Sequence, residues 1–263
     1  MTNTTPMKPR KLRALAAALV LASGLTMAPS YASQNSAELH AMAHEYPTAE
    51  TLSAKQQAIP LIAVSMAKSD MPSLRSALNQ GLDAGLTISE AKEMLVQLYA
   101  YVGFPRSLNA LGELKSVVEE RRKRGMHDAP GREPGHPAPT GDALLTVGTA
   151  NQTRIAGKPV KGPLFDFAPV INQLLQAHLF GDIFERDNLD WQSRELATVG
   201  ALAATPGVEA QLGSHVAASV RVGLTVSQLR QLAQTLANHG DADAAQRVGK
   251  ALDAYLAKAG GSN

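Results

Sequence analysis

Residues 190–223, DWQSRELATVGALAATPGVEAQLGSHVAASVRVG, predict two helices joined by a tight turn. Asp190 is a favourable N-cap, and the residues after it are apolar at helical spacing as far as the turn. Thr205 followed by Pro206 then predicts a cap and the first position of a second helix, which Gly223 ends. The stretch therefore predicts an antiparallel helical hairpin.

Two ionisable residues occupy matching positions in this hairpin. Glu195 precedes Thr205 by ten residues and His215 follows it by ten, so both should lie about 15 Å from the turn at about 1.5 Å per residue. Both share a helical stripe with apolar residues, which turns them toward the core. A buried charge requires a partner, and such pairs also serve as acid/base catalysts. The geometry leaves open whether this pair is a site or only joins two helices.

The chain repeats at an offset of 138 residues. The Gly-Leu-Thr run at 85–87 falls on that at 223–225 without a gap, and Leu74 and Ser76 fall on Leu212 and Ser214. Agreement at the same turn and caps indicates the duplication of a helical unit.

The offset also bears on the Glu195 and His215 pair. Glu195 falls on Gln57 and His215 falls on Ala77, so the first copy lacks both ionisable groups. A pair needed only to hold a hairpin together would be equally useful in both copies. The difference favours a site role in the second copy.

The periodicity of the whole chain predicts an all-α fold, since no stretch shows sustained strand alternation. A capping box at Thr87 and Glu90 and caps at Thr225 and Asp241 mark three helix starts. We expect helices over about 55–68, 72–84, 88–101, 105–124, 142–157, 165–184, 190–204, 206–222, 225–238 and 241–258.

The N-terminus predicts a cleaved signal peptide over residues 1–32. Four basic residues precede the apolar run LAAALVLASGLTMA, and Ser30-Tyr31-Ala32 supplies small residues for cleavage. The run is shorter than the roughly 20 residues that span a bilayer, which disfavours a membrane anchor. We therefore expect a periplasmic or secreted protein with no membrane contact after cleavage. The expected units are 33–124 as the first repeat, 125–141 as a Gly- and Pro-rich linker and 142–263 as the second repeat.

Charge and cysteine content exclude two classes of function. The chain has 25 basic and 23 acidic residues, but residues 1–32 contain four of the basic ones and no acidic one, so the mature protein is slightly acidic. We therefore expect no nucleic-acid partner. The absence of cysteine removes disulfides and thiol chemistry.

Three stretches carry a resemblance to a known family. LFGDIFERDNLDWQSRELATVGALAA and GSHVAASVRVGLT resemble the carboxymuconolactone decarboxylase family, which is related to the alkylhydroperoxidases. AGLTISEAKEMLVQLYAYVGFPRSLNAL resembles the same family's helix pair with its Tyr-x-Gly-x-Pro turn. The likeness covers most of residues 50–122 and 160–255. It implies an alkylhydroperoxidase-like helical bundle in two tandem repeats and a homo-oligomer, either a trimer or a hexamer.

The resemblance separates the two branches of that superfamily. The alkylhydroperoxidase relatives place cysteines four and seven residues before the histidine, and here those positions are Gln211 and Val208. A thiol peroxidase needs a thiolate and a resolving sulfur. The sequence therefore predicts that this protein is not a thiol peroxidase.

The decarboxylase branch needs no sulfur and, as the resemblance implies, no metal or organic cofactor. The implied reaction removes CO₂ from a small unsaturated lactone or a related carboxylated compound. In it, His215 would donate a proton, Glu195 would orient the imidazole, and Arg106 or Tyr101 would hold a carboxylate. The sequence leaves open whether the chain is an enzyme, possibly a carboxy-lyase, or a noncatalytic oligomeric binding or scaffold protein of the periplasm.

Overall fold

The computed structural model describes residues 51–260, and every regular element in that part of the chain is helical. The all-α prediction is therefore confirmed for these residues, whereas the predicted signal peptide lies outside them. None of the described helices is long and apolar enough to cross a membrane. We call the first five helices the N-terminal set: α2 (Ala54–Lys68), α3 (Met71–Asp83), α4 (Ile88–Gln97), α5 (Tyr99–Val102) and α6 (Phe104–Lys123).

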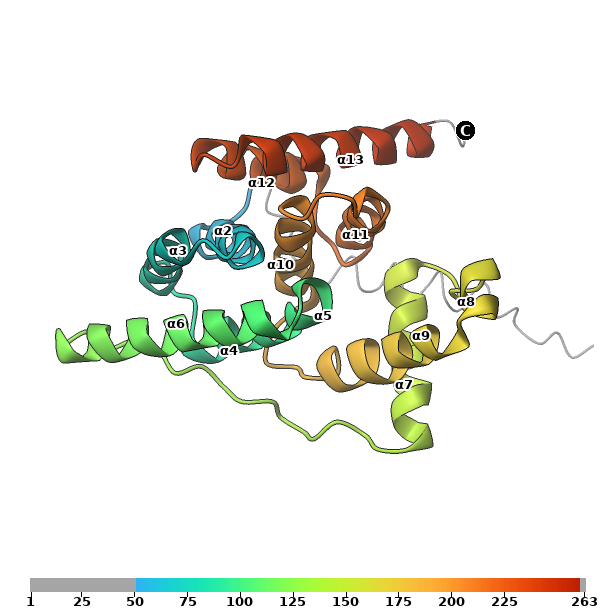
Figure 1. The fold of residues 1–263 in the computed structure, drawn as a ribbon, viewed down its shortest axis with the longest axis horizontal. Helices are drawn as coiled ribbons and strands as arrows, with labels where there is room; N and C mark the ends of the chain where they lie inside the picture. The colour runs from blue at the N-terminus through green and yellow to red at the C-terminus, as the bar shows by residue number, and fades with distance from the viewer. Residues whose placement is uncertain (1–50, 261–263) are drawn as a thin grey trace, which may run out of the picture. The chain divides into compact units, whose positions relative to one another are not determined.

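The second part of the chain begins with one long helix and three short elements, and it ends with four further helices (Figure 1). The first group is α7 (Asp142–Ala156), α8 (Pro163–Phe167), α9 (Pro169–Leu174) and the π-helix η1 (Leu175–Ile183). The remaining four we call the C-terminal set: α10 (Trp191–Ala203), α11 (Glu209–Arg221), α12 (Val226–Asn238) and α13 (Ala242–Gly260).

Side-chain caps start several helices where the sequence predicts them. Thr87 and Thr225 each form a capping box, with Glu90 and Gln228 as the reciprocal partners. Asp190 accepts a hydrogen bond from the backbone N–H of Ser193 at 2.8 Å. These local bonds fix the helix starts before any tertiary packing is considered.

The prediction that Thr205 and Pro206 start the second hairpin helix is wrong. The Thr205 hydroxyl donates back to the carbonyl of Ala201 at 2.9 Å, so it extends the end of α10. Gly207 then takes a φ of +86°, and α11 begins only at Glu209. The turn is therefore longer than predicted.

The single long helix predicted over residues 165–184 is also wrong. Ala168 leaves helical geometry with φ −131°, because the residue before a proline is pushed toward extended backbone, and Pro169 starts a new helix. After α9 the chain continues as the wider π-helix η1, which packs closely against α7. A Cβ placed on Gly148 would lie 1.8 Å from the carbonyl oxygen of Gln176, so only glycine fits there.

One hydrophobic core joins the N-terminal and C-terminal sets. Its members come from both, and α2 and α10 lie side by side at its centre (Figure 1). A Cβ on Gly200 would lie 2.9 Å from both the Cα and the carbonyl oxygen of Pro60, which shows how closely the two helices approach. A smaller apolar cluster joins α7 and η1 to α11 through Ile155, Phe180 and Ala218.

The segment predicted as a linker, residues 125–141, contains no regular element and is hydrogen-bonded to the helices. The backbone N–H groups of Ile88 and Ser89 donate to the carbonyls of Ala129 and Pro130 at 2.9 and 3.0 Å. Asp187 accepts from the Gly135 N–H at 2.7 Å.

The helix bounds agree with the offset of 138 residues found in the sequence. α3 covers residues 71–83 and α11 covers 209–221, which are the same positions after the shift. α4 and α12 likewise start at 88 and 226. This agreement supports the predicted duplication, which remains a prediction.

Candidate functional site

Glu195 and His215 meet at the interface of α10 and α11. His215 Nδ1 lies 2.8 Å from Glu195 Oε2, so the two residues placed at equal height by the sequence form a direct contact. The Glu195 side chain is fully buried, whereas 15 % of the His215 side chain is exposed. We refer to these two residues as the acid–imidazole pair.

The packing of α11 explains why His215 points at α10. Leu212 and Val216 are buried and anchor the inner face of the helix, and His215 lies between them in sequence. The His215 carbonyl also accepts the Ser219 hydroxyl at 2.8 Å. The imidazole is therefore held between a fixed helix and the Glu195 carboxylate, which occupies Nδ1.

The other ring nitrogen of His215 is available. No hydrogen bond within residues 51–260 involves Nε2, and part of the ring reaches solvent. A carboxylate beside Nδ1 fixes the ring's orientation, and a doubly protonated imidazole carries its second proton on Nε2. The pair can therefore present a proton at Nε2.

Two buried polar atoms at this place, one in the pair and one beside it, lack a well-formed hydrogen bond. Glu195 Oε1 and the Tyr101 hydroxyl are both buried, and neither makes a hydrogen bond of normal distance and angle within residues 51–260, although Thr198 interacts weakly with the hydroxyl. Such atoms are uncommon in folded proteins, because burying an unpaired polar group is costly. Their presence here indicates a place where a water molecule or a ligand group completes the hydrogen bonding.

Tyr101, one of the two predicted substrate-binding residues, contacts the pair. Its ring lies 5.3 Å from the His215 ring in an edge-on arrangement at 81°. Burial, and after it the negative charge of Glu195, raises the pKa of the Tyr101 phenol well above its usual value of about 10. The hydroxyl therefore stays protonated at neutral pH and can donate a hydrogen bond.

Arg106, the other predicted substrate-binding residue, is exposed at the start of α6. Its guanidinium donates to the carbonyl of Val102 at 2.9 Å. No contact in the described part of the chain joins Arg106 to Glu195 or His215. The structure therefore does not bring it to the pair.

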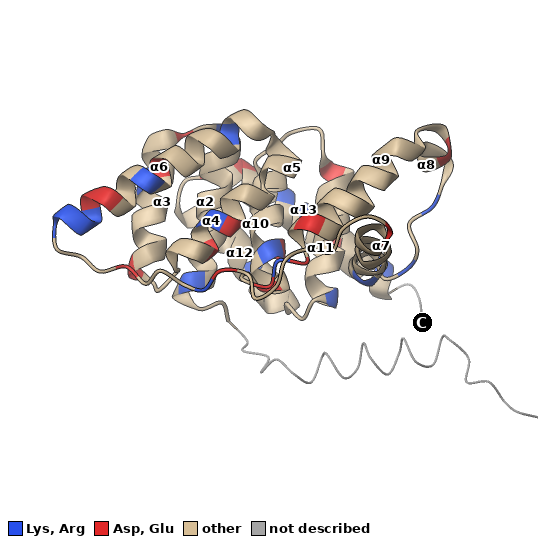
Figure 2. Ribbon diagram, turned by 90° about the horizontal axis from the view of Figure 1, so that it is seen from below, with Lys and Arg blue, Asp and Glu red and all other residues tan. Residues whose placement is uncertain are grey.

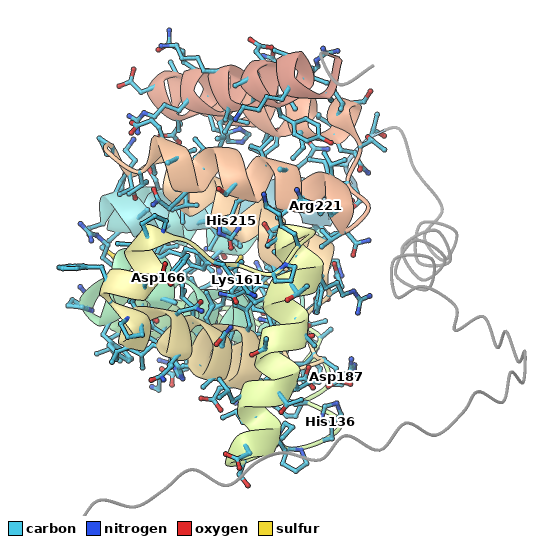
Figure 3. All side chains as sticks on the ribbon, turned by 90° about the vertical axis from the view of Figure 1, so that its right-hand side faces the viewer. His136, Lys161, Asp166, Asp187, His215 and Arg221 are labelled. Carbon is cyan, nitrogen blue, oxygen red and sulfur yellow. The ribbon has the colours of Figure 1, made fainter. Side chains whose placement is uncertain are left out.

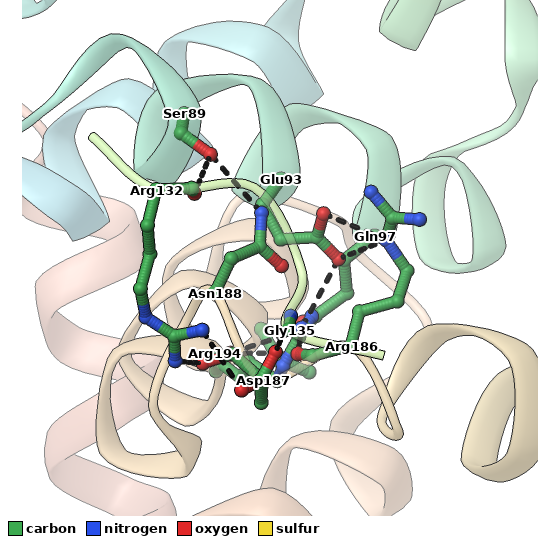
Figure 4. Close-up of polar contacts among 10 residues, drawn as sticks. Ser89, Glu93, Gln97, Arg132, Gly135, Arg186, Asp187, Asn188 and Arg194 are labelled. Carbon is green, nitrogen blue, oxygen red and sulfur yellow. Dashed lines mark hydrogen bonds and ion pairs between the residues drawn. The ribbon is translucent and has the colours of Figure 1, made fainter. Parts of the chain in front are cut away.

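A buried ionic cluster that the sequence pattern did not predict lies next to the site (Figure 4). The Glu93 carboxylate accepts hydrogen bonds from Arg194 at 3.0 Å and from Arg186 at 2.8 Å. Arg194 also donates to Gln97 at 2.8 Å and is fully buried. Burial lowers the pKa of the Arg194 guanidinium, and the charge of Glu93 opposes that shift.

This ionic cluster positions the acid–imidazole pair. Arg194 directly precedes Glu195 on α10, and Glu93 lies on α4, so their ion pair ties α10 to the N-terminal set. The sequence held a signal for it, because Arg194 interrupts a helix that is otherwise mostly apolar. An unpaired arginine would be too costly to bury there.

The described residues around the pair do not supply a thiol or a metal site. Val208 and Gln211 occupy the positions where the alkylhydroperoxidases carry cysteines, and neither supplies sulfur. Among residues 51–260, no group of three or more His, Cys, Asp or Glu side chains is placed to hold a metal ion. A groove of about 790 Å³ between α11 and α13 and one of about 380 Å³ between α4 and α6 include neither Glu195 nor His215 in their walls.

Comparison with known proteins adds one finding. Residues 169–254 match the sequence model of the Carboxymuconolactone decarboxylase family. This segment runs from α9 into α13 and contains the acid–imidazole pair, so the match supports a decarboxylase-like or alkylhydroperoxidase-like assignment for this part of the chain. No curated protein matches the chain.

Proposed function

We propose that this protein is a carboxymuconolactone decarboxylase-like enzyme that acts on a small unsaturated lactone or a related carboxylated compound. The observation that supports the proposal is the 2.8 Å contact between Glu195 and His215, with one imidazole nitrogen left available. The family match over residues 169–254 includes both residues. The proposed chemistry is acid/base catalysis by the side chains of the chain itself.

The proposed reaction breaks one carbon–carbon bond and forms one carbon–hydrogen bond. The substrate carboxylate leaves as CO₂, and its bonding electrons move into the conjugated lactone carbonyl to give a dienolate. His215 then donates its Nε2 proton to carbon, and the imidazole regains a proton from solvent. The Glu195 carboxylate stabilises the charged ring before transfer and orients it throughout.

Tyr101 is the proposed hydrogen-bond donor to the substrate. Its protonated hydroxyl, which makes no hydrogen bond of normal geometry within residues 51–260, lies beside the pair, where it can donate to the developing oxyanion of the dienolate. Arg106 is exposed, and its guanidinium donates to the Val102 carbonyl at the end of α5, so the proposal assigns it no contact with the substrate.

The direct test measures CO₂ release from carboxymuconolactone and from a panel of related unsaturated lactone carboxylates. His215→Gln and Glu195→Gln should lower kcat by about 10²–10⁴-fold, the usual contribution of a positioned acid or base. Far-UV circular dichroism should show that both variants keep their helix content.

His239→Gln is the matched control, because the His239 side chain bonds only to the Thr235 carbonyl of its own helix among the described residues. It should leave turnover unchanged. A wild-type protein that converts none of the panel, or pair variants that retain full turnover, would contradict the proposal.

Exposed apolar side chains favour the oligomer that we propose as the functional form. Leu164 and Phe167 on α8 and Val170 on α9 are 66 %, 88 % and 63 % exposed. Exposed apolar side chains that lie close together in the sequence are usual at protein interfaces. Light scattering should give a mass of three or six chains, and Phe167→Asp with Val170→Asp should reduce it. An oligomer with no turnover would instead favour the noncatalytic scaffold.

Export is the proposed location, on the basis of the basic and apolar pattern in residues 1–32. N-terminal sequencing of the protein from a periplasmic fraction should find a chain that begins at Ser33. Recovery of the intact N-terminus from the cytoplasm would contradict this.

A further inference from the structure

The groove between α11 and α13 has features of a ligand site that is separate from the acid–imidazole pair. Its volume of about 790 Å³ lies within the range of about 300–1,000 Å³ typical of small-molecule sites. Small residues line its floor, with Ala210, Gly213 and Ala217 on α11 and Ala251 and Ala254 on α13.

Gly213 shows that this floor is open. A Cβ built on Gly213 would meet no other atom within 4 Å, although the residue lies in the middle of α11. A larger side chain at this position would therefore extend into the groove without displacing the core.

The rim of the groove is strongly cationic. Its basic lining residues are Arg221, Arg247, Lys158, Lys250 and Lys258, whereas Glu209 is its one acidic lining residue. Figure 3 shows Arg221 on the same helix as His215. A net positive rim over an apolar floor suits a molecule with an anionic head and an apolar body.

Two of these cations are held in place by backbone carbonyls. Arg221 donates to the Ile155 carbonyl at 2.9 Å, and Arg247 donates to the Ala203 carbonyl at 2.7 Å. A carbonyl bond positions a guanidinium without neutralising its charge. Glu209 accepts from the Gly207 N–H at 3.1 Å at the N-terminal end of α11, the same end as Ala203. The other end, at Arg221 and Lys158, is cationic.

The equivalent helices of the N-terminal set show why the groove is open. Arg75 on α3 contacts Glu113, Ser116 and Glu120 on α6, at 2.6, 3.2 and 2.8 Å. At the offset of 138 residues the bridging residues become Gly213, Ala251, Ala254 and Lys258. The side chains that join α3 to α6 are thus missing between α11 and α13, except for a lysine where Glu120 stands.

We propose that the α11–α13 groove binds an amphipathic organic anion, with its carboxylate or sulfonate at the Arg221 end and its apolar body along the alanine floor. The α11 wall from Glu209 to Arg221 is about 18 Å long at about 1.5 Å per residue, which suits an elongated molecule. The inference stands apart from the proposed decarboxylation, because neither Glu195 nor His215 lines this groove.

The test uses two fluorescent probes with the same aromatic frame. 1-Anilinonaphthalene-8-sulfonate carries an anionic group, and N-phenyl-1-naphthylamine lacks it. Gly213→Leu should weaken sulfonate binding by about tenfold or more, measured as the dissociation constant by titration calorimetry. Gly112→Leu is the matched control, because a Cβ on Gly112 of α6 also meets nothing within 4 Å but lies outside the groove.

A second pair of substitutions tests whether the basic residues bind the anionic group of the ligand, separately from its apolar part. Arg221→Gln with Lys158→Gln should weaken binding of the sulfonate about tenfold and leave the neutral probe unchanged. Dodecanoate should displace the sulfonate, and inorganic phosphate at the same concentration should not.

Equal sulfonate binding by wild type and Gly213→Leu would overturn the proposal, as would equal displacement by dodecanoate and phosphate. If Gly213→Leu fails to fold, Ala254→Leu fills the same groove from the exposed side of α13 and carries the same expectation.

Discussion

The helix pairs α3–α6 and α11–α13 have matching positions in the sequence, but their surfaces differ. Between α3 and α6, ion pairs from Arg75 and Arg121 cross from helix to helix. Acidic and basic segments alternate along α6 (Figure 2). Between α11 and α13, Gly213 and Ala251 replace the residues of one such pair, and a groove remains. The buried faces of the two helix pairs can thus pack alike, while the outer face carries bridging side chains in one pair and a groove large enough for a ligand in the other.

The two helical hairpins differ in the same way. In α10–α11 the acid–imidazole pair joins the helices, whereas in α2–α3 the corresponding residues are Gln57 and Ala77. Gln57 donates to the Leu52 carbonyl at 2.9 Å, and Ala77 is buried in the core. The α2–α3 hairpin is therefore stable without an ionisable pair.

The largest predicted effect comes from removing the Arg121 guanidinium, which forms ion pairs at the end of α6. The Arg121 side chain is 4 % exposed and pairs with Asp128, which is 7 % exposed, so Arg121→Met leaves a buried carboxylate unpaired. The free energy of unfolding should fall by about 3 kcal/mol. Lys250→Met on the open pair should change it by less than about 0.5 kcal/mol. Urea denaturation measures both, and losses of equal size would show that the two pairs are held alike.

The second prediction tests the crossing of α2 and α10, where the two sets meet. Gly200 faces the backbone of Pro60, while the residue at its offset position, Ile62, is a full-sized core side chain. Gly200→Val should cost about 1–3 kcal/mol of stability, because the clash is with backbone atoms. Gly213→Ala, with open space around it, should instead stabilise the protein by up to about 1 kcal/mol. Thermal unfolding that ranks the two variants in the opposite order would contradict this account of the crossing.

The third prediction uses the raised pKa of Tyr101, whose offset position holds His239. Below pH 10 the phenol is protonated in both the folded and the unfolded state. Above the unfolded pKa of about 10, the unfolded chain loses this proton and the folded chain keeps it, so stability falls by about 1.4 kcal/mol per pH unit. Tyr101→Phe should remove this part of the alkaline decline in denaturation experiments between pH 9.5 and 11, values chosen around that pKa of about 10.

Tyr99→Phe is the control for this prediction, because it removes a phenol from the same short helix. It should leave the decline unchanged. An identical alkaline slope in wild type and Tyr101→Phe would show that the Tyr101 phenol ionises as easily in the folded state as in the unfolded one.

The smallest predicted effect comes from building the ion pair of α3–α6 into the helix pair α11–α13. Gly213→Arg with Ala251→Glu places the Arg75 and Glu113 pair between α11 and α13. A double-mutant cycle should give a coupling of about 0.5 kcal/mol, as for other exposed ion pairs. The same variant should lose sulfonate binding in the groove. Zero coupling would show that the two helix pairs are not equivalent in geometry.

Local chemistry allowed much of this fold to be predicted from the sequence. The caps at Thr87, Asp190 and Thr225 act on the next few residues, so the sequence shows them directly. The meeting of Glu195 and His215 followed from equal spacing about one turn. That turn proved longer than predicted, yet the two residues still meet, because a shift of this size is small against the reach of their side chains.

The features that the sequence did not reveal depend on contacts between distant segments. Glu93 and Arg194 are 101 residues apart, and no spacing rule relates them. The π-helix η1 depends on the close crossing at Gly148, which a periodic pattern does not encode. The α11–α13 groove depends on small residues of two helices that are distant in the sequence, at the positions where α3 and α6 are joined by longer side chains.

Residues 125–141 are hydrogen-bonded to helices on both sides, so the chain does not separate there into two independent halves. Ser89 also donates to the Arg132 carbonyl at 2.6 Å, and Asp187 pairs with Arg132 at 2.8 Å, so this segment is fastened on both sides. The core beneath it draws on both helix sets. A protease that cut near His136 would leave a nicked molecule whose fragments stay associated, and neither half expressed alone would have a complete interior to fold around.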